Sequence, residues 1–346
     1  MKGKGDKYGS HRVIEPKGVL PQAAWKIDND MEIYSNEILC DVITLNIDSA
    51  SFTQIKEQAN QDEQKIGEII LDTVAKRGKQ HNPVTGSGGM FIGKVKEIGK
   101  DLEGKIDLKV GDKIASLVSL STTPLKINKI LKVKKDKEQV DIDGTAILFE
   151  SGIWAKIPDN IPETVALAAL DVAGAAPQVA RLVKPGDTVF IIGATGKSGV
   201  LCAYEAKKRA GINGKVIGLG HSPNKVERLK KLGYCDEVIC VDATNPLAVL
   251  EAFTKATNGK LADVTINTVN IPNTEMASIL TTRDDGVIYF FSMATSFTKA
   301  ALGAEGVGKD VVMLIGNGYT KGHAAFTLHM FEESKELYEL FKELYG

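Results

Sequence analysis

Residues 188–206 read TVFIIGATGKSGVLCAYEA, and this stretch decides the fold of the second half of the chain. Residues 188–192 are apolar or β-branched and predict a buried strand, whereas the residues from 197 onward have the composition of a helix. Three glycines, Gly193, Gly196 and Gly199, stand between them. A strand, a glycine-rich turn and a helix in this order are typical of a dinucleotide-binding Rossmann unit.

Each glycine of the turn has its own physical reason in such a unit. The first permits a sharp bend, the second lets the backbone approach a pyrophosphate, and the third lets the helix pack against the strand. The helix N-terminus offers N–H groups and a partial positive charge to the phosphates. The alternative is a tight turn without a ligand. The residues predicted here to bind the coenzyme are Gly193, Thr195, Gly196, Lys197, Ser198 and Gly199.

The end of the second strand indicates which dinucleotide binds. An NAD site normally has an acidic residue there for the ribose 2′-hydroxyl, but this chain has Gly220, 21 residues after the third glycine, followed by His221 and Ser222. Lys225 and Arg228 follow on the next helix and have the charge that a 2′-phosphate requires. NADP is therefore expected, with NAD as the alternative. In that alternative Ser222 is an ordinary helix N-cap and the two cations are merely solvated.

The rest of the chain predicts an α/β protein with a β-rich first part. From residue 188 to about 290 strands alternate with helices, which predicts a parallel, doubly wound sheet with right-handed crossovers. Residues 31–48 and 88–157 have the β-branched composition and the glycine breaks of strands, with an exposed charged hairpin around KVKKDKEQVDIDG. Single helices are expected over 52–78, 162–184 and 327–346.

Composition restricts the partners. The 346 residues have a net charge of −1, which gives no sign of nucleic acid or of an anionic membrane surface as a partner. No stretch of 18 apolar residues occurs, and the N-terminus lacks an apolar signal segment. The four cysteines have no metal-ligand spacing and are expected to be free, mostly buried thiols. A cytoplasmic location is therefore expected.

Three phrases carry a resemblance to a known family: GGMFIGKVKEIGKDLEGKIDLKVGDKI at 88–114, LVKPGDTVFIIGATGKSG at 182–199, and DEVICVDA at 236–243. In order and spacing they resemble the medium-chain dehydrogenase/reductase superfamily. The resemblance implies a GroES-like β-rich substrate domain, a Rossmann domain and a homodimer. The implied domains are residues 1–161, residues 162–314, and a C-terminal segment, 315–346, that returns to the first domain.

The departures from this family concern the metal. Zinc-dependent members have a Gly-His-Glu triplet in the glycine-rich turn, where this chain has Gly88, Gly89 and Met90. They also have a cysteine ligand after an early strand, where LNIDSAS at 45–51 has none. The resemblance is therefore to the zinc-free branch, and no zinc cofactor is expected.

The N-terminal segment KYGSHRVIEPKGVLPQAAWKIDN, residues 7–29, narrows the resemblance to enzymes of bacterial lysine fermentation that deaminate a diamino acid. The implied reaction is the oxidative deamination of L-erythro-3,5-diaminohexanoate to 5-amino-3-oxohexanoate and ammonia. Such a substrate requires a base for the reacting ammonium, an acceptor for the second ammonium, and a cation for its carboxylate.

Candidates for these roles follow from their positions. Asp171 interrupts an apolar helical run, and its role as base or ammonium acceptor weighs equally with that of a helix cap or salt-bridged core acid. Asp48 and Ser49 lie where the family has residues that face the nicotinamide. The remaining candidates are Glu150 as a second acid, Arg12, Glu15 and Lys17 as substrate ligands, and Met293 as a coenzyme contact. Each has a plainer alternative: a strand-end acid, a solvated N-terminus, and a core methionine.

Two other functions are compatible with the same fold. One is a zinc-free NADPH-dependent quinone or enone reductase, which shares the fold and the coenzyme. The other is a non-catalytic dinucleotide-binding protein that senses redox state. Turnover of diaminohexanoate with release of ammonia separates the first function from both of these.

Overall fold

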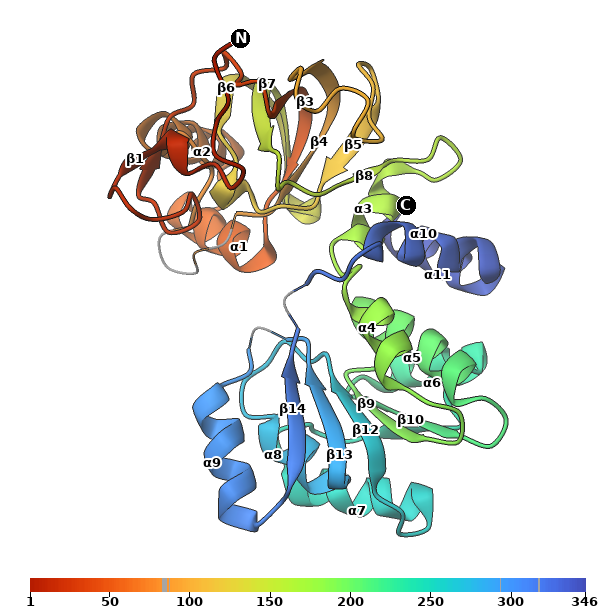
Figure 1. Ribbon diagram of the computed structural model, residues 1–346. Helices are drawn as coiled ribbons and strands as arrows, with labels where there is room; N and C mark the ends of the chain where they lie inside the picture. The colour runs from red at the N-terminus through yellow and green to blue at the C-terminus, as the bar shows by residue number, and fades with distance from the viewer. Residues whose placement is uncertain (83–85, 87, 293, 317) are drawn as a thin grey trace. The chain divides into compact units, whose positions relative to one another are not determined.

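The computed structural model describes residues 1–82, 86, 88–292, 294–316 and 318–346, with Ser49 and Ala50 described by their backbone alone (Figure 1). The chain separates into two compact units, Met1–Ile161 and Pro162–Gly346. Each unit has its own β-sheet and its own apolar core. The fold class expected from the sequence is confirmed, because the first sheet is antiparallel and the second is parallel.

The first unit is built on a six-stranded antiparallel sheet with the order β6-β7-β3-β4-β5-β8. Its central strand is almost wholly buried, and its side chains pack with those of neighbouring strands and helices around Phe52 and Phe91. The expected charged hairpin is present, with a short 3-10 turn at Lys135–Lys137. The strands are β3 (Glu37–Asn46), β4 (Met90–Ile98), β5 (Lys113–Ser116), β6 (Leu125–Lys134), β7 (Gln139–Phe149) and β8 (Trp154–Lys156).

Two helices replace the single helix expected over residues 52–78. They are α1 (Ser49–Gln58) and α2 (Glu63–Arg77). The chain turns between them because Asn60 and Gln61 have positive φ angles of 51° and 64°, which end a right-handed helix. Asp62 then caps α2 by accepting a hydrogen bond from the amide of Lys65 at 3.0 Å. The periodic apolar residues of α2 still face the core, as the sequence pattern indicates.

The N-terminal segment forms a small layer of its own within the first unit. A 3-10 turn, η1 (Ser10–Arg12), leads into β1 (Val13–Glu15), which pairs antiparallel with β2 (Lys26–Ile27). Val13 and Ile27 lie in a small apolar cluster beneath this ribbon. The strand expected over 31–48 is shorter than predicted, because regular pairing begins only at Glu37.

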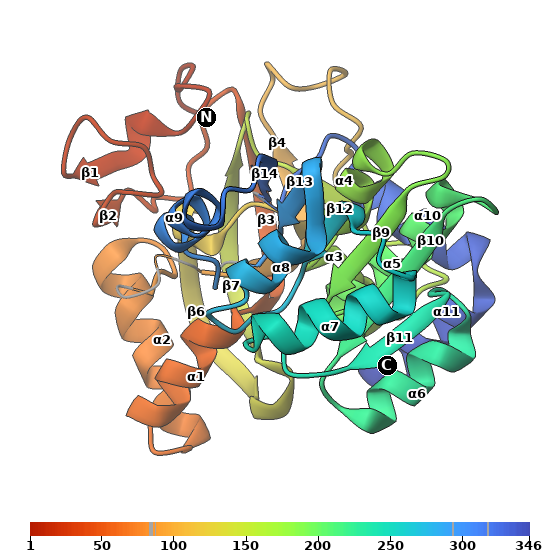
Figure 2. The ribbon, with the colours of Figure 1, turned by 90° about the horizontal axis from the view of Figure 1, so that it is seen from below.

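The second unit contains a six-stranded parallel sheet with the order β11-β10-β9-β12-β13-β14. The chain adds β10 and β11 on one side of β9 and then β12, β13 and β14 on the other side. The carboxyl end of β9 is therefore the switch point at which such sheets bind ligands. Helices α7, α8 and α9 lie together on one side, in the foreground of Figure 2, and α5 and α6 cover the other face. The strands are β9 (Thr188–Ile192), β10 (Lys215–Gly220), β11 (Glu237–Cys240), β12 (Ala262–Asn267), β13 (Thr282–Phe290) and β14 (Val311–Ile315). The helices are α5 (Lys197–Ala210), α6 (Pro223–Leu232), α7 (Pro246–Thr257), α8 (Glu275–Thr281) and α9 (Phe297–Val307).

Residues 162–184, expected as one helix, form α3 (Glu163–Leu170) and α4 (Ala175–Leu182). They are separated by a turn that ends at Gly174, whose missing side chain lets the backbone of Gly318 approach closely. Within the described chain, no single helix is long and apolar enough to cross a bilayer, although α3 and α4 meet that criterion as a pair bent by 47°.

The predicted C-terminal helix is also divided in two. Helices α10 (His323–Glu333) and α11 (Lys335–Tyr345) meet at Ser334, whose hydroxyl accepts from the amide of Leu337 at 3.2 Å and starts α11. Helix α10 contacts α3 and α4, and Thr327 donates a hydrogen bond to the carbonyl of Ala173 at 3.0 Å. The division of the chain into three segments with a boundary at 314/315 stays a prediction.

Candidate functional site

The glycine-rich turn joins β9 to α5 as the sequence predicts. Gly193 has a φ of 88°, and the amides of Gly193 and Ala194 both donate to the carbonyl of Leu219 on the neighbouring strand, at 3.0 and 2.9 Å. A Cβ on Gly199 would overlap the carbonyl oxygen of Gly193. The two atoms would be much closer than 3.0 Å, the separation below which Cβ contacts are essentially never found. Both glycines are therefore required by the packing of the turn itself.

Gly196 has a different explanation. Its φ of −84° and ψ of 172° suit any residue, and among the described residues a Cβ placed there would meet only the Gly193 carbonyl oxygen, at 3.5 Å. The first N–H within helix α5 to find a helical acceptor is that of Val200, which donates to Gly196. The amides of Lys197, Ser198 and Gly199 precede it and have no acceptor inside the helix. Open space before a row of amides at a helix N-terminus fits the pyrophosphate of a dinucleotide.

The carboxyl end of β10 is packed against this turn. A Cβ on Gly220 would lie 2.5 Å from the side chain of Thr195 and 2.8 Å from that of Val226, so Gly220 is needed to make room for Thr195. Ser222 stands at the N-cap of α6, but its side chain makes no capping hydrogen bond. His221 and Lys225 are exposed and Arg228 is half-buried. Met293, predicted as a coenzyme contact, lies outside the described residues.

Asp171 corrects one expectation. The sequence predicts a buried acid, but Asp171 is exposed at the end of α3, because the helix ends there and leaves its side chain at the surface. Its carboxylate forms an ion pair with the ammonium of Lys197 at 2.6 Å. Since Lys197 is the first residue of α5, this ion pair connects Asp171 to the glycine-rich turn between β9 and α5. The ring of Tyr345 lies 5.7 Å from the same ammonium group, and burial raises the pKa of this tyrosine.

Arg12, predicted to bind the substrate, lies in a buried ion-pair network. Its Nε and Nη2 atoms donate to the two carboxylate oxygens of Glu37, both at 2.7 Å. Its remaining donors reach the carbonyls of Asp28, Asp30 and Glu32, so all guanidinium N–H groups have protein acceptors. Arg12 is only 1% exposed. These contacts indicate a structural role in holding the N-terminal segment.

The carboxylate of Glu37 at the centre of this network is fully buried. Burial raises its pKa, but hydrogen bonds from Arg12, His11 and the amide of Tyr34 outweigh that effect, and the pKa is lower than its usual value. The other predicted substrate ligands of this segment lie near its surface. Glu15 is exposed at the end of β1, and the ammonium of Lys17 donates to the carbonyl of Val13.

The remaining predicted residues of the first unit are Asp48, Ser49 and Glu150. Asp48 is the N-cap of α1, and its carbonyl accepts from the amide of Phe52 at 2.8 Å; Ser49 is the first residue of the helix. Glu150 accepts a hydrogen bond at 3.0 Å from the amide of Asn36, which also bonds to Gly5. Glu150 thus helps to fix the N-terminal segment.

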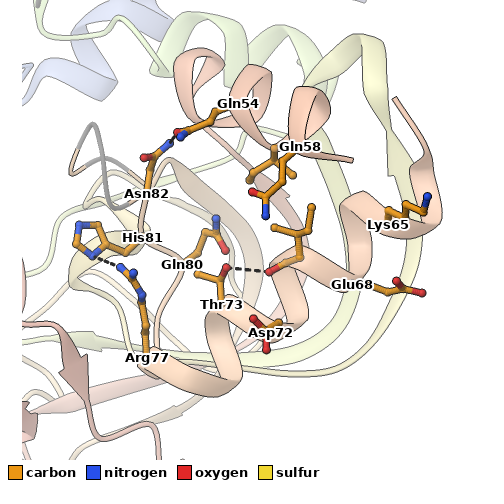
Figure 3. Close-up of a pocket in the computed structure, with 12 residues that line it drawn as sticks. Gln54, Gln58, Lys65, Glu68, Asp72, Thr73, Arg77, Gln80, His81 and Asn82 are labelled. Atoms are coloured by element: carbon orange, nitrogen blue, oxygen red, sulfur yellow. Dashed lines mark hydrogen bonds between the residues drawn. The ribbon is translucent and has the colours of Figure 1, made fainter. Parts of the chain in front are cut away.

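The sequence analysis missed a pocket of about 550 Å³ in the first unit, shown in Figure 3. Helices α1 and α2 and the segment 77–82 line this open pocket. The only sequence signal was the polar run KRGKQHN at 76–82, which has neither a motif nor a regular spacing. The lining residues are Gln54, Ile55, Gln58, Lys65, Glu68, Ile69, Asp72, Thr73, Arg77, Gln80, His81 and Asn82.

The basic groups beside this pocket have unusual pKa values. Burial, together with the charges of Lys79 and Arg77, lowers the pKa of His81 to about 4. Burial and the charge of Arg77 lower the pKa of Lys79 to about 8. The Arg77 guanidinium lies over the ring of Trp25, 3.7 Å from its centroid, and donates to Nδ1 of His81 at 3.2 Å. His81 is therefore a neutral imidazole at pH 7, with its proton on Nε2.

The low pKa of His81 predicts a loss of stability in acid. Between pH 6.5 and about pH 4 the unfolded chain binds a proton at His81 that the folded protein does not bind. The free energy of unfolding therefore decreases as the pH is lowered through this window, by about 2 kcal/mol for a partly exposed ring. Urea unfolding of the wild type and of His81→Asn at about pH 7 and about pH 4.5 measures this contribution. Equal acid sensitivity of both proteins would contradict it.

Among the residues that the structure describes, no group of three or more His, Cys, Asp or Glu side chains lies close enough together to hold a metal ion. The four cysteines are free, and Cys40, Cys202 and Cys235 are buried as expected, whereas Cys240 is exposed.

An antiparallel β unit joined to a parallel Rossmann unit with this turn defines the medium-chain dehydrogenase/reductase fold. Solved structures of similar fold include the quinone oxidoreductase of Escherichia coli in complex with NADPH, with a TM-score of 0.54 and 17% identity, covering 90% of this chain and 82% of the other. An alcohol dehydrogenase from Thermotoga maritima has a TM-score of 0.55 and 17% identity, with coverage of 90% and 86%.

Sequence comparison identifies the family within this fold. The family model described as the L-erythro-3,5-diaminohexanoate dehydrogenase N-terminal domain matches residues 11–158, and that of the zinc-binding dehydrogenases matches residues 199–320. Proteins named L-erythro-3,5-diaminohexanoate dehydrogenase from Acetoanaerobium sticklandii and Fusobacterium nucleatum are 62% and 60% identical to this chain, each over 99% of both chains. The chain belongs to the L-erythro-3,5-diaminohexanoate dehydrogenase family. The narrower resemblance noted in the N-terminal segment is thereby confirmed.

Proposed function

We propose that this protein catalyses the oxidative deamination of L-erythro-3,5-diaminohexanoate to 5-amino-3-oxohexanoate and ammonia, with a nicotinamide dinucleotide as the hydride acceptor. The observation that carries the proposal is the identity of 62% and 60% to two dehydrogenases of that name across nearly the whole chain. The glycine turn, with its open space at Gly196 and its unused helix amides, supports the dinucleotide.

The chemistry follows from the substrate. At neutral pH the amino group on C3 is an ammonium, and its lone pair becomes free only after a base removes a proton. The lone pair then forms the C=N bond as hydride leaves C3, water adds to the imine carbon, and ammonia leaves to give the ketone. The dinucleotide, when bound, supplies the carbon that accepts the hydride. The protein has to hold the substrate, accept the proton and keep the reacting carbon in place.

We propose Asp171 as the proton acceptor, because its ion pair with Lys197 connects it to the coenzyme turn within one unit. Asp48 stays a second candidate, at the N-terminus of α1. Glu150 is less suitable, since its carboxylate is used in binding Asn36. Glu15, Lys17 and Ser49 stay predictions as substrate ligands, and the contacts of Arg12 make that role unsuitable for it.

We further propose that no zinc ion takes part. The positions where zinc-dependent members of the fold have ligands carry Gly88, Gly89 and Met90, which have no side-chain donor suited to zinc. The nitrogen lone pair itself drives hydride departure, so the amine needs no Lewis acid to polarise a carbon–oxygen bond.

NADP is the proposed coenzyme. Support comes from the absence of a carboxylate at Gly220 and from the cations Lys225 and Arg228 on the following helix. Lys225→Gln should raise the KM for NADP roughly tenfold and leave the KM for NAD unchanged, because only NADP presents a 2′-phosphate to the ammonium. The control is Lys231→Gln at the far end of α6. Equal changes for both coenzymes would point to NAD, or to a site that does not distinguish them.

We also propose a homodimer. Strand β14 lies at the edge of the parallel sheet and leaves Val312 and Ile315 more than half exposed. Nearby in the chain, Phe297 and Leu302 of α9 are exposed to a similar extent. An open edge with exposed apolar side chains is a suitable surface for a second copy of the chain. Light scattering at micromolar concentration gives the mass directly.

A single assay tests the proposed reaction. Purified protein is mixed with L-erythro-3,5-diaminohexanoate and NADP or NAD, and both reduced nicotinamide and ammonia are measured. The proposal predicts equal amounts of the two products. Reduction of a quinone by NADPH without any amine turnover would identify a quinone reductase instead, and coenzyme binding without turnover would identify a redox sensor.

A further inference from the structure

The pocket of the first unit contains a buried acceptor without a donor. Gln80 is only 2% exposed, and its side-chain oxygen Oε1 has no hydrogen-bond partner. Figure 3 shows the Gln80 amide in the middle of the lining residues, close to Thr73 of α2. A buried amide oxygen left unpaired destabilises a protein. A ligand whose N–H group donates a hydrogen bond to Oε1 of Gln80 would explain why this oxygen has no partner within the protein.

The same pocket is lined by a buried cation, Arg77, that forms no ion pair with a carboxylate among the described residues. Arg77 is 8% exposed, and its guanidinium contacts the Trp25 ring and Nδ1 of His81. Lys79 lies directly behind this wall, fully buried, and donates to the carbonyls of Pro21 and Gln22. Neither cation has a carboxylate within ion-pair distance in the part of the chain that the structure describes. The positive charge at this end therefore favours an anionic ligand group.

The opposite wall carries both charges. Glu68 and Asp72 of α2 line the pocket on the side away from His81, together with Lys65, and the amide of Gln58 lies above Asp72 in Figure 3. Asp72 is already paired with Lys76 at 2.6 Å. A hydrogen bond of 2.7 Å between the amide of Asn82 and Oε1 of Gln54 closes the upper wall. The pocket therefore offers donors at the Arg77 end and the unpaired acceptor of Gln80 in its middle.

We propose that this pocket binds the diamino acid substrate, with its carboxylate at Arg77 and Nε2–H of His81 and its C5 ammonium group at Oε1 of Gln80, so that the amino group on C3 stays free for the proton acceptor. The inference rests on the proposed function for the identity of the ligand. The volume of about 550 Å³ is within the range of small-molecule sites and accommodates a six-carbon chain.

Two substitutions test the two ends separately. Gln80→Met keeps the volume but removes the acceptor, and Arg77→Lys keeps the charge but removes the planar fork of donors. Each should weaken binding of L-erythro-3,5-diaminohexanoate by about tenfold or more, measured by calorimetry and as KM. Gln80→Met should leave the melting temperature unchanged or raise it, because it removes an unpaired buried oxygen. A merely structural glutamine would lower it.

The matched control is Gln139→Met. Gln139 is a buried glutamine of β7 in the same unit, 6% exposed, whose amide donates to Oδ1 of Asn46. Its replacement should lower the melting temperature and leave the KM for the substrate unchanged, the reverse of Gln80→Met.

The outcomes separate this inference from the proposed function. If the wild type turns over the diamino acid and the KM is unchanged in Gln80→Met and Arg77→Lys, the pocket is not the substrate site, but the proposed reaction is supported. If the wild type binds the diamino acid without turning it over, and Gln80→Met loses this binding, the pocket is supported as a binding site and the proposed reaction is contradicted.

Discussion

Replacing Gly196 by alanine should weaken coenzyme binding about 5- to 100-fold and leave the melting temperature unchanged. The protein itself has room for the added methyl group, because the one neighbour it would meet in the described part of the chain is the Gly193 carbonyl oxygen at 3.5 Å, and the backbone angles suit alanine. A dinucleotide lying against this turn would collide with the methyl group, and overpacking of this kind costs about 1–3 kcal/mol. Calorimetric titration with NADP and NAD measures the effect.

Two companion variants make this result specific. Gly199→Ala should lower both coenzyme affinity and melting temperature, because its Cβ meets the backbone of Gly193 in the protein itself. Gly306→Ala in α9 has no atom within 4 Å and should stabilise the helix slightly without affecting coenzyme binding. Wild-type affinity in Gly196→Ala would mean that no ligand approaches the turn there.

Arg12→Met should lower the free energy of unfolding by about 3–5 kcal/mol, an effect on stability and not on catalysis. The substitution removes two hydrogen bonds of 2.7 Å from a carboxylate that has no contact with water, and leaves Glu37 charged and buried. Since the pKa of Glu37 is lowered in the folded protein, its contribution to stability is present above the unfolded pKa and is lost as pH falls through the folded value. Urea unfolding near neutral pH is the measurement.

The double variant Arg12→Met/Glu37→Leu should recover much of this loss, because it removes the unpaired charge along with its partner. As a comparison, Lys96 and Asp41 form an exposed pair at 2.8 Å in the same unit, and Lys96→Met should cost less than about 1 kcal/mol. An Arg12→Met protein of normal stability with a raised KM would restore Arg12 to the substrate site.

The coenzyme turn could be predicted because its signal is local. A strand, three glycines and a helix within nineteen residues determine the geometry, and no distant partner is needed to interpret them. The parallel sheet followed from the same kind of short-range alternation. The helix breaks were missed because apolar periodicity continues across them, whereas Asn60, Gln61 and Ser334 change the backbone without changing the pattern.

The roles of Arg12, Asp171 and Gln80 could not be predicted in the same way, because they depend on partners far along the chain. Arg12 appears as a free cation in the sequence, and its partner Glu37 lies 25 residues away. Asp171 was expected to be buried because its neighbours are apolar, but the helix ends there and Lys197 is 26 residues distant. Gln80 has no distinguishing feature in the sequence, and only the folded chain shows that its oxygen lacks a donor.

The contact between Thr195 and Gly220 restricts how an acidic residue could arise at the carboxyl end of β10. A single mutation that introduced an aspartate at 220, as NAD enzymes have, would drive its Cβ into the threonine methyl group at 2.5 Å. A Cβ at 220 would also lie 2.8 Å from the side chain of Val226, so the substitution would be harmful unless both neighbours had already become smaller. Evolution, or a protein engineer, would need these changes in a fixed order, with the smaller neighbours preceding the acid on the strand.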